Sequence, residues 1–215
     1  MRHEIPGRRI IQRGAEAVLY LRDGERGQEL VKERLSKGYR IAQLDMKIRK
    51  QRTRAEAKLM ERARANGIAV PRVRTEDAFR LVMEYVKGAK LKDALNAMAA
   101  GERKKVCMEM GGLIAALHGA GVIHGDLTTS NMILSDEDSE KGKIYLIDFG
   151  LGKFSSSVED QAVDLFLLFE ALKATHFAVL DACWKDVTDG YASRFGKAKD
   201  VLARLEKIKK RRRYK

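Results

Sequence analysis

The apolar pattern of the chain changes once, near Glu84–Gly88, and this change limits the folds that the chain can adopt. Before that point, short apolar runs with strand-like composition alternate with turn residues, and one helical stretch covers residues 41–65. After it, the pattern is mostly helical. A β-rich part followed by an α-rich part predicts an α+β protein with two lobes. The strands expected in the first part are 10–12, 16–21, 28–32, 73–75 and 79–84.

Turn residues mark the ends of several of these elements. Asp23-Gly24 predicts a hairpin between the second and third strands, and Asn66-Gly67 predicts the end of the long helix. In the second part we expect helices over 91–99, 103–118 and 162–172, and short strands over 122–123, 132–134 and 143–147. The remainder is expected to be helical and increasingly basic.

Composition excludes several classes of protein. A chain of 215 residues with 45% hydrophobic and 34% charged residues is long enough to bury a core and is not mostly disordered. No apolar core follows the first residues, and the apolar-rich stretches 111–123 and 162–172 are too short to span a bilayer. Cys107 and Cys183 are isolated thiols without metal-ligand spacing, which indicates a reducing compartment. We therefore expect a cytoplasmic protein with no membrane contact and no disulfide partner.

The net charge of +13 is unevenly distributed along the chain. Residues 1–83 carry 21 lysines and arginines against 11 acidic residues, residues 84–193 carry 11 against 17, and residues 194–215 carry 11 against 2. A basic head and a basic tail around an acidic middle indicate a polyanionic partner. Nucleic acid is favoured over a membrane surface, because no amphipathic apolar face accompanies the tail.

The segments His124–Asn131 and Asp148-Phe149-Gly150 carry the residue types that phosphoryl transfer from ATP requires. That chemistry needs a carboxylate beside the attacking hydroxyl, together with oxygen ligands that hold Mg²⁺ on the phosphates. Asp126 is the expected catalytic base, and Asn131 and Asp148 are the expected magnesium ligands. The alternative is that Asp126 and Asn131 are turn residues and Asp148 caps a loop. The order of the two segments, each after a short strand-like run, favours the first interpretation.

Lys32 and Glu56 are the expected upstream partners of these segments. Lys32 ends the third predicted strand, where it would pair with the α- and β-phosphates, and Glu56 on the long helix would hold it in place. The alternatives are a solvated edge lysine and a capping box, because Thr53-Arg54-Ala55-Glu56 matches the capping-box signature. We expect Lys32, Asp126, Asn131 and Asp148 to converge on a metal-bound triphosphate.

Two further segments are candidates for ATP binding. Leu81–Val86 resembles the hinge that binds adenine: the Glu84 carbonyl and the Val86 amide would meet the base, and Met83 would form the back wall. The alternative is an ordinary buried strand followed by a Lys-Gly turn. Upstream, Gly14 and Val18 are the candidates for the loop over the phosphates, although the usual three spaced glycines are reduced here to one.

With these residues in place, the chain resembles the protein-kinase superfamily, and within it the small atypical, RIO-like kinase subunit of the KEOPS tRNA-modification complex. Over nearly the whole chain, the resemblance rests on the segments 14–17, 32–34, 37–40, 44–45, 52–57, 124–131 and 148–150 and on the basic tail. It implies a minimal bilobal kinase-like fold with an antiparallel N-lobe sheet (residues 1–86), a reduced helical C-lobe (87–206) and a basic tail (207–215). It also implies ATP and Mg²⁺ as cofactors, ATPase and serine/threonine kinase activity, and tRNA, the threonylcarbamoyl-transferase subunit and other KEOPS subunits as partners.

Three features depart from ordinary protein kinases. Gly125 stands where the usual His-Arg-Asp has arginine, so no cation is available to bind a phosphorylated activation loop, and Thr128 replaces a lysine found in many kinases. No Ala-Pro-Glu follows Gly150, which predicts that a peptide-docking platform is missing. Asp164 would hydrogen-bond the catalytic-loop backbone, or it is a plain carboxylate at the start of a helix.

The basic tail is a candidate RNA-phosphate clamp, with Tyr214 available to stack on a base. A solvated, solubilising end is the alternative, and a solvated helix face is the favoured interpretation of the second basic stretch at 49–54. His118 and His176 are expected to be packing or surface residues. The candidate RNA-binding residues are Lys209, Lys210, Arg211, Arg212, Arg213 and Tyr214.

Three other functions share some of these features. A small-molecule kinase of the aminoglycoside or choline type also uses a His-Gly-Asp loop, but it needs an acidic C-terminal pocket where this chain has cations. A RIO-type ribosome-biogenesis kinase is closer. A nucleotide-binding pseudokinase scaffold is the non-enzymatic alternative, and the intact set of Lys32, Asp126, Asn131 and Asp148 speaks against it.

Overall fold

The computed structural model describes residues 9–25, 27–136 and 143–213. The contacts divide the chain into two compact units, the first comprising Met1–Glu61 and Pro71–Tyr85 and the second Arg62–Val70 and Val86–Lys215. The first contains an antiparallel sheet and the second is mostly helical, so the predicted α+β class is confirmed.

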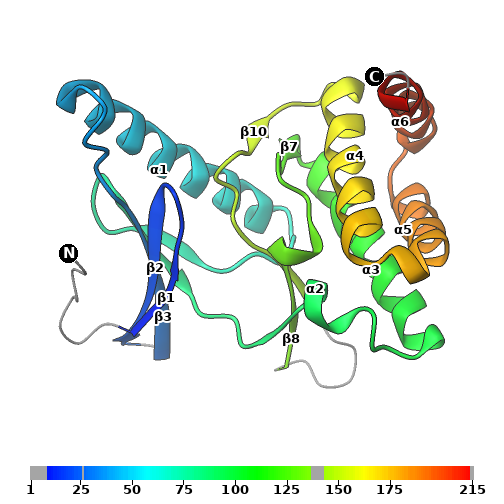
Figure 1. Ribbon diagram of the computed structural model, residues 1–215, viewed down its shortest axis with the longest axis horizontal. Coiled ribbons are helices and arrows are strands. Elements are labelled where there is room, and N and C mark those ends of the chain that lie inside the picture. Colours follow the sequence, from blue (N-terminus) through cyan, green and yellow to red (C-terminus); the bar gives the residue numbers. More distant parts are fainter. Residues whose placement is uncertain (1–8, 26, 137–142, 214–215) are drawn as a thin grey trace. The chain divides into compact units, whose positions relative to one another are not determined.

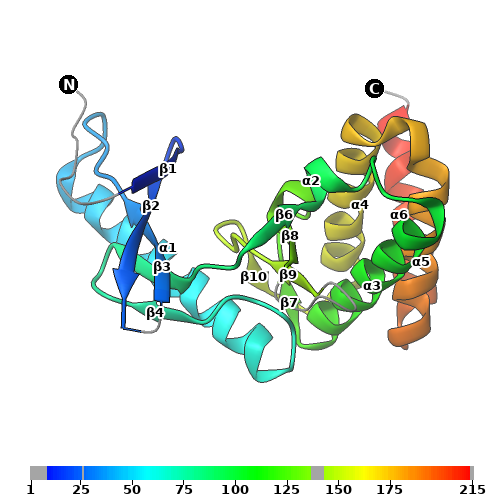
Figure 2. The ribbon, with the colours of Figure 1, turned by 90° about the horizontal axis from the view of Figure 1, so that it is seen from below.

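The first unit is built on a five-stranded antiparallel sheet in the order β1-β2-β3-β5-β4. Figure 1 labels β1, β2 and β3, and Figure 2 also labels β4. The hairpin predicted at Asp23-Gly24 joins β2 to β3, with Gly24 opposite Gly27. Gly27 adopts a φ of +107°, a conformation that favours glycine. The predicted pairing of the last two strands is also present, and the strand bounds are Arg9–Arg13 (β1), Ala17–Gly24 (β2), Gly27–Arg34 (β3), Val73–Thr75 (β4) and Arg80–Glu84 (β5).

The two faces of this sheet have different roles. Val18 and Val31 are buried with Tyr20 and Val82 on one face, and Ile10 packs against them. Lys32 is paired with Leu19 and lies on the other face, because side chains alternate along a strand. This register therefore sets which residues share a face with Lys32.

The helix α1 spans Ala42–Ala65, as its apolar spacing predicts. Leu59, Met60 and Ala63 are buried along one side of it. It ends at the predicted Asn66-Gly67: Gly67 has a φ of +76°, and the Ile68 amide donates to the Ala63 carbonyl at 3.2 Å. A left-handed residue after the last turn satisfies carbonyls that the helix leaves unpaired.

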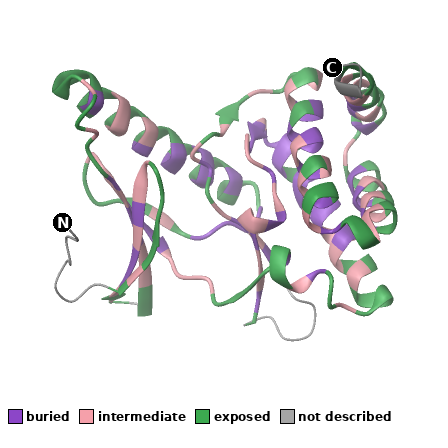
Figure 3. Cartoon of the chain, viewed as in Figure 1, coloured by how far each residue is buried: buried purple, intermediate pink, exposed green. Residues whose placement is uncertain are grey.

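Long helices form most of the second unit, and their buried faces meet in its core (Figures 2 and 3). α3 packs against α5 and α4 packs against α6. Glycines permit the first of these contacts, because a Cβ on Gly111 would lie 2.0 Å from the Val187 carbonyl oxygen and one on Gly190 would lie 2.1 Å from that of Met108. The helices are Ala100–Gly119 (α3), Val158–Thr175 (α4), Leu180–Arg194 (α5) and Ala198–Arg213 (α6).

Two small sheets complete the second unit. β8 (Met132–Ser135) lies between β6 (Gly88–Lys90) and β9 (Ile144–Leu146), and β7 (Val122–Ile123) pairs with β10 (Lys153–Phe154). The predicted short strands at 122–123, 132–134 and 143–147 are confirmed, whereas β6 and β10 were not predicted. Two 3-10 turns, η1 (Thr129–Asn131) and η2 (Phe177–Val179), join the longer elements.

The helix predicted over 91–99 is wrong in its length, because α2 covers only Leu91–Ala94. The Ala97 amide donates to the Ala94 carbonyl at 3.1 Å, a tight turn that does not continue the helix. Asn96 is engaged elsewhere: its Nδ2 donates to the Thr175 carbonyl, and its Oδ1 pairs with His176 Nδ1 at 2.8 Å. Tertiary hydrogen bonds thus override a helical pattern that the sequence suggests.

The cysteines are free and buried, but they are not isolated from each other. The neighbouring thiol of Cys183 on α5, together with burial, raises the pKa of Cys107 on α3. Within the described ranges, no helix is both long and apolar enough to cross a membrane.

We predict that Gly111→Ala lowers the free energy of unfolding, because the new methyl group would have to push α3 away from the α5 backbone. The expected loss is about 1–3 kcal/mol, the usual cost of overpacking. Gly101→Ala on the same helix is the matched control, since nothing lies within 4 Å of the position that its Cβ would take. Urea unfolding of both variants measures the difference, and equal stability would contradict the close helix contact.

Candidate active site

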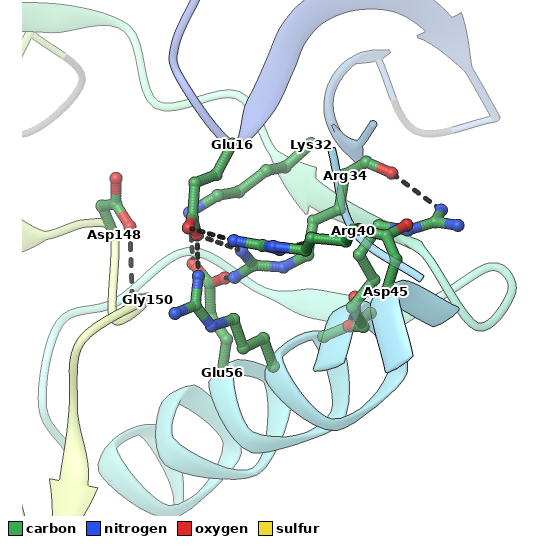
Figure 4. A network of polar contacts seen from close by, with 11 residues as sticks. Glu16, Lys32, Arg34, Arg40, Asp45, Glu56, Asp148 and Gly150 are labelled. Carbon is green, nitrogen blue, oxygen red and sulfur yellow. Dashed lines mark hydrogen bonds and ion pairs between the residues drawn. The ribbon is translucent and has the colours of Figure 1, made fainter. Parts of the chain in front are cut away.

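Lys32 and Glu56 form a buried ion pair in the first unit (Figure 4). Lys32 Nζ on β3 lies 2.7 Å from Glu56 Oε1 on α1, and the two side chains are 9% and 0% exposed. Thr53 lies inside α1 and donates its hydroxyl to the Arg49 carbonyl, so it does not cap a helix start. The geometry therefore favours the ion pair over both the solvated lysine and the capping box.

Glu56 also binds a second cation that the sequence did not single out. Arg34 Nη2 lies 2.5 Å from Glu56 Oε2, so each carboxylate oxygen of Glu56 faces its own cation. Arg34 stands two residues after Lys32 on β3 and thus on the same sheet face. That spacing, with a carboxylate on the following helix, is the sequence signal from which this contact could have been predicted.

The turn between β1 and β2 contains Gly14, whose amide donates to the Ala17 carbonyl at 2.9 Å. The assignment of Val18 to the nucleotide site needs correction. Val18 is opposite Glu33 in the β2–β3 register and is packed with Tyr20, on the face away from Lys32. On β2, the residues that share the Lys32 face are Ala17, Leu19, Leu21 and Asp23, and Leu19 is directly opposite Lys32. The prediction assigned Val18 from its position in the kinase motif. Because side chains alternate along β2, its neighbours Ala17 and Leu19 are on the Lys32 face instead.

The predicted hinge residues lie at the end of β5. Met83 is buried and is paired with Leu30 and Val73, on the same sheet face as Lys32. The Glu84 amide donates to the Arg72 carbonyl at 2.9 Å, and its carboxylate accepts from Arg72 Nε at 3.1 Å. Val86 follows as a half-buried residue. The roles of Met83, Glu84 and Val86 toward adenine stay predictions.

In the second unit, Asp126 and Asn131 face each other across the loop that ends in η1. Asn131 Nδ2 donates to Asp126 Oδ2 at 2.8 Å and to the Asp126 carbonyl at 3.0 Å. Because its NH₂ group points at Asp126, the Asn131 amide presents its oxygen on the opposite side. The Asn131 carbonyl accepts from the Ile147 amide at 3.0 Å, which brings the segment before Asp148 beside this loop.

Asp148 has the one positive φ, +62°, among the described residues other than glycine. Its Oδ1 accepts from the Gly150 amide at 3.2 Å (Figure 4). Such a backbone is uncommon and is often kept at functional sites. Asn131 and Asp148 offer an amide oxygen and a carboxylate, which are the hard ligands that Mg²⁺ takes together with substrate phosphates. The donor set therefore fits the predicted metal.

His124 connects the two motif segments. Its ring lies against that of Phe149 with centroids 4.6 Å apart, and its Nε2 is 3.1 Å from the Ile147 carbonyl, which can only accept. Nδ1 accepts from the Asp126 amide at 3.3 Å. Burial lowers the pKa of His124, which fits the neutral imidazole that these partners require.

Asp164 on α4 holds the backbone of the catalytic loop, which confirms the first of its two interpretations. Its two carboxylate oxygens accept from the amides of His124 and Gly125, each at 2.8 Å, and the side chain is fully buried. His118 Nε2 lies 3.2 Å from Asp164 Oδ2, and His118 Nδ1 lies 2.9 Å from Tyr191 Oη. Because a carboxylate can only accept, Nε2 donates to Asp164, and Nδ1 shares a hydrogen bond with the Tyr191 hydroxyl. His118 is therefore a buried link between Asp164 and Tyr191, a role for which the sequence carries no local signal.

Gly125 is required by its surroundings. It has a φ of +78°, and a Cβ there would lie 2.2 Å from the Leu151 carbonyl oxygen. The chain then runs through β10 and reaches α4 at Val158, where Ser157 caps the helix by accepting from the Asp160 amide. The segment between Gly150 and α4 is thus short.

The described part of the basic tail belongs to α6, up to Arg213. Lys209 lies 3.9 Å from the centroid of the Phe169 ring and pairs with Glu206, so it is engaged within the protein. Lys210 and Arg211 are exposed. Tyr214 and the side chains of residues 212 and 213 lie outside the described part of the chain.

Two members of the second basic stretch are also engaged in ion pairs. Arg49 Nε lies 2.7 Å from Asp45 Oδ2, and Arg52 pairs with Glu16. Arg54 is exposed, which fits a solvated helix face at that position.

Comparison with known proteins gives one family and a group of relatives. The protein kinase domain model matches residues 29–172. The KEOPS complex subunit Bud32 of Pyrococcus abyssi is 41% identical over 96% of this chain and 96% of its own length. The "probable bifunctional tRNA threonylcarbamoyladenosine biosynthesis protein" of Methanosarcina mazei is 41% identical, and that of Methanothermobacter thermautotrophicus is 39% identical. Those matches cover 98% and 95% of this chain but 36% of each bifunctional relative.

We predict that Asp164→Asn loosens the catalytic loop. The amide keeps one acceptor oxygen but turns its NH₂ group toward the second backbone donor, so a buried N–H loses its partner, at a cost of roughly 1–3 kcal/mol. Amide hydrogen exchange at His124 and Gly125 should accelerate. Asp181→Asn, an exposed carboxylate in the first turn of α5, is the control and should have no effect. Unchanged exchange in Asp164→Asn would contradict this role.

Proposed function

The chain belongs to the family of proteins with a protein kinase domain, and on this basis we propose that it binds ATP with Mg²⁺ and cleaves off the terminal phosphoryl group. The observation that carries the proposal is the ion pair between Lys32 and Glu56 at 2.7 Å. Burying a charged pair costs several kcal/mol per ion before the pair forms. Such a pair stabilises a fold little by itself, whereas a kinase uses it to aim a lysine at phosphates.

The roles of the other residues follow from their chemistry. We assign Lys32 to the α- and β-phosphates, and Glu56 to holding Lys32 in one position. Asp126 accepts the proton of the attacking hydroxyl or water, while Asn131 and Asp148 hold the metal. Bound Mg²⁺ neutralises charge on the phosphates. Met83, Glu84 and Val86 are assigned to adenine, and the turn at Gly14 to the phosphates.

We propose that water is the main acceptor, so that the protein acts as an ATPase, with serine/threonine phosphorylation as its second activity. The short segment from Gly150 to Val158 supports this, because a peptide substrate needs a surface on which to lie. Gly125 also supports it, since the loop offers no arginine to a phosphorylated segment.

We further propose that the protein works in the cytoplasm as a KEOPS subunit, with tRNA, the threonylcarbamoyl-transferase subunit and other KEOPS subunits as partners. The support is the match to the P. abyssi Bud32 over the length of both chains. The relatives named for tRNA threonylcarbamoyladenosine biosynthesis add to it. Nearly all of this chain matches about a third of each of them, so they contain a segment similar to this chain. The exposed cations of α6 fit a polyanionic partner.

Substitutions at Asp126 and Lys32 should separate turnover from binding. Asp126→Ala is expected to abolish ATP hydrolysis and to leave nucleotide affinity largely intact. Lys32→Met is expected to impair both, without leaving a buried carboxylate unpaired, because Arg34 still faces Glu56. Hydrolysis assays with and without tRNA and the transferase subunit, and calorimetric binding, provide the two measurements.

The controls for that experiment are exposed residues of the same types. Asp93→Ala removes a surface carboxylate on α2 and Lys58→Met removes a surface lysine on α1, and neither should change hydrolysis. Full activity in Asp126→Ala would show that the catalytic roles are misassigned.

Neutralising the exposed cations of the tail should weaken tRNA binding. With Lys207, Lys210 and Arg211 changed to glutamine, we expect lower affinity and a salt dependence whose slope falls by roughly 2–3, at about 0.7–0.9 for each phosphate that is no longer neutralised. Changing Lys58, Lys104 and Lys105 to glutamine removes the same charge from exposed positions elsewhere and serves as the control. An unchanged slope in the tail variant would mean that the tail is only solubilising.

A further inference from the structure

The turn between β1 and β2 is held by more contacts than its one glycine requires. Besides the bond between the Gly14 amide and the Ala17 carbonyl, the Glu16 carbonyl accepts from the Leu35 amide at 3.3 Å, which ties the turn to the end of β3. Gly14 itself does not adopt a left-handed conformation. The turn therefore keeps its shape through bonds to neighbouring elements, and not through glycine flexibility.

The Glu16 side chain adds contacts to three other segments (Figure 4). Its carboxylate pairs with Arg52 on α1, and it lies 3.8 Å from Arg34 on β3 and 3.8 Å from Arg40 in the loop before α1. These cations, with the hydrogen bond from Arg52 as the largest contribution, lower the pKa of Glu16. A single exposed ion pair is worth little. Here one carboxylate faces cations from three different segments, and one of them, Arg34, is only 5% exposed.

These contacts continue to the lysine assigned to the phosphates. Glu16 faces Arg34, Arg34 binds one oxygen of Glu56, and Lys32 binds the other oxygen of Glu56. Opposite charges thus alternate from the tip of the turn to Lys32. Because Arg34 is shared by both carboxylates, a change at Glu16 alters the surroundings of the pair that holds Lys32.

We propose that Glu16 is a positioning residue for the nucleotide phosphates. Its ion pairs fix the turn at 14–17 in place of the missing glycines, and through Arg34 they keep Glu56 and Lys32 aligned. The proposal rests on the proposed function, since it assigns a role within ATP binding. It predicts that the loss of Glu16 weakens binding of the phosphate part of the nucleotide and leaves binding of the nucleoside part unchanged.

The test compares two ligands by calorimetry, a non-hydrolysable ATP analogue and adenosine. Glu16→Gln should lower affinity for the ATP analogue about 5- to 10-fold, within the range of coupling between neighbouring charged residues. Affinity for adenosine and the melting temperature should stay the same. Glu16→Asp should recover part of the loss. Arg52→Gln should act in the same direction, and the double variant should be no weaker than the weaker single variant.

Glu76→Gln is the matched control, since Glu76 also pairs with two arginines in the first unit, Arg22 and Arg80. It should leave affinity for both ligands unchanged. Unchanged affinity of Glu16→Gln for the ATP analogue would overturn the inference alone. Equal losses for adenosine and the analogue, with a lower melting temperature, would also overturn it by showing general destabilisation. A wild-type protein that does not bind the analogue at all would overturn the proposed function, and the inference with it.

Discussion

The shape of the catalytic loop depends on one buried carboxylate. Asp164 accepts hydrogen bonds from two consecutive backbone amides, and no water is needed to satisfy those donors. Its third contact, with His118, leads to Tyr191, so α3, α4 and α5 all contribute to holding the loop. Asp126 follows directly after the two residues held in this way, and its carboxylate accepts from Asn131 Nδ2 at 2.8 Å.

In the first unit too, a buried carboxylate holds its neighbours in place, but its partners are charged side chains and not backbone amides. Glu56 is fully buried and faces two cations, where a single ion pair would have balanced its charge. The second cation, Arg34, also faces another carboxylate, that of Glu16. Charged groups buried in this way stabilise little by themselves, but they define one arrangement of side chains. In both units, then, the side chains assigned to catalysis are held by residues that would not contact the substrate.

The sequence predicted most of the elements and several contacts of the candidate site, because motif residues and turn residues carry local signals. It anticipated Lys32 with Glu56, the contact of Asp164 with the loop, and the hairpin at Asp23-Gly24. The sequence did not predict long-range contacts such as those of His118, because its partners lie 46 and 73 residues away along the chain. The two wrong predictions also depended on partners elsewhere in the chain. The helix over 91–99 was predicted too long because Asn96 hydrogen-bonds with His176, 80 residues away. Val18 was placed on the wrong face because the pairing of β2 with β3 turns it away from Lys32.

The close approach at Gly125 has a consequence for how a protein of this kind can evolve. Any side chain at this position would meet the Leu151 carbonyl oxygen at 2.2 Å, so the backbone after Gly150 would have to move first. An arginine, which could serve a phosphate-sensing loop, therefore requires two coordinated changes and not one. A substitution at Gly125 alone would therefore cost stability, because the chain after Gly150 already lies where the new side chain would begin.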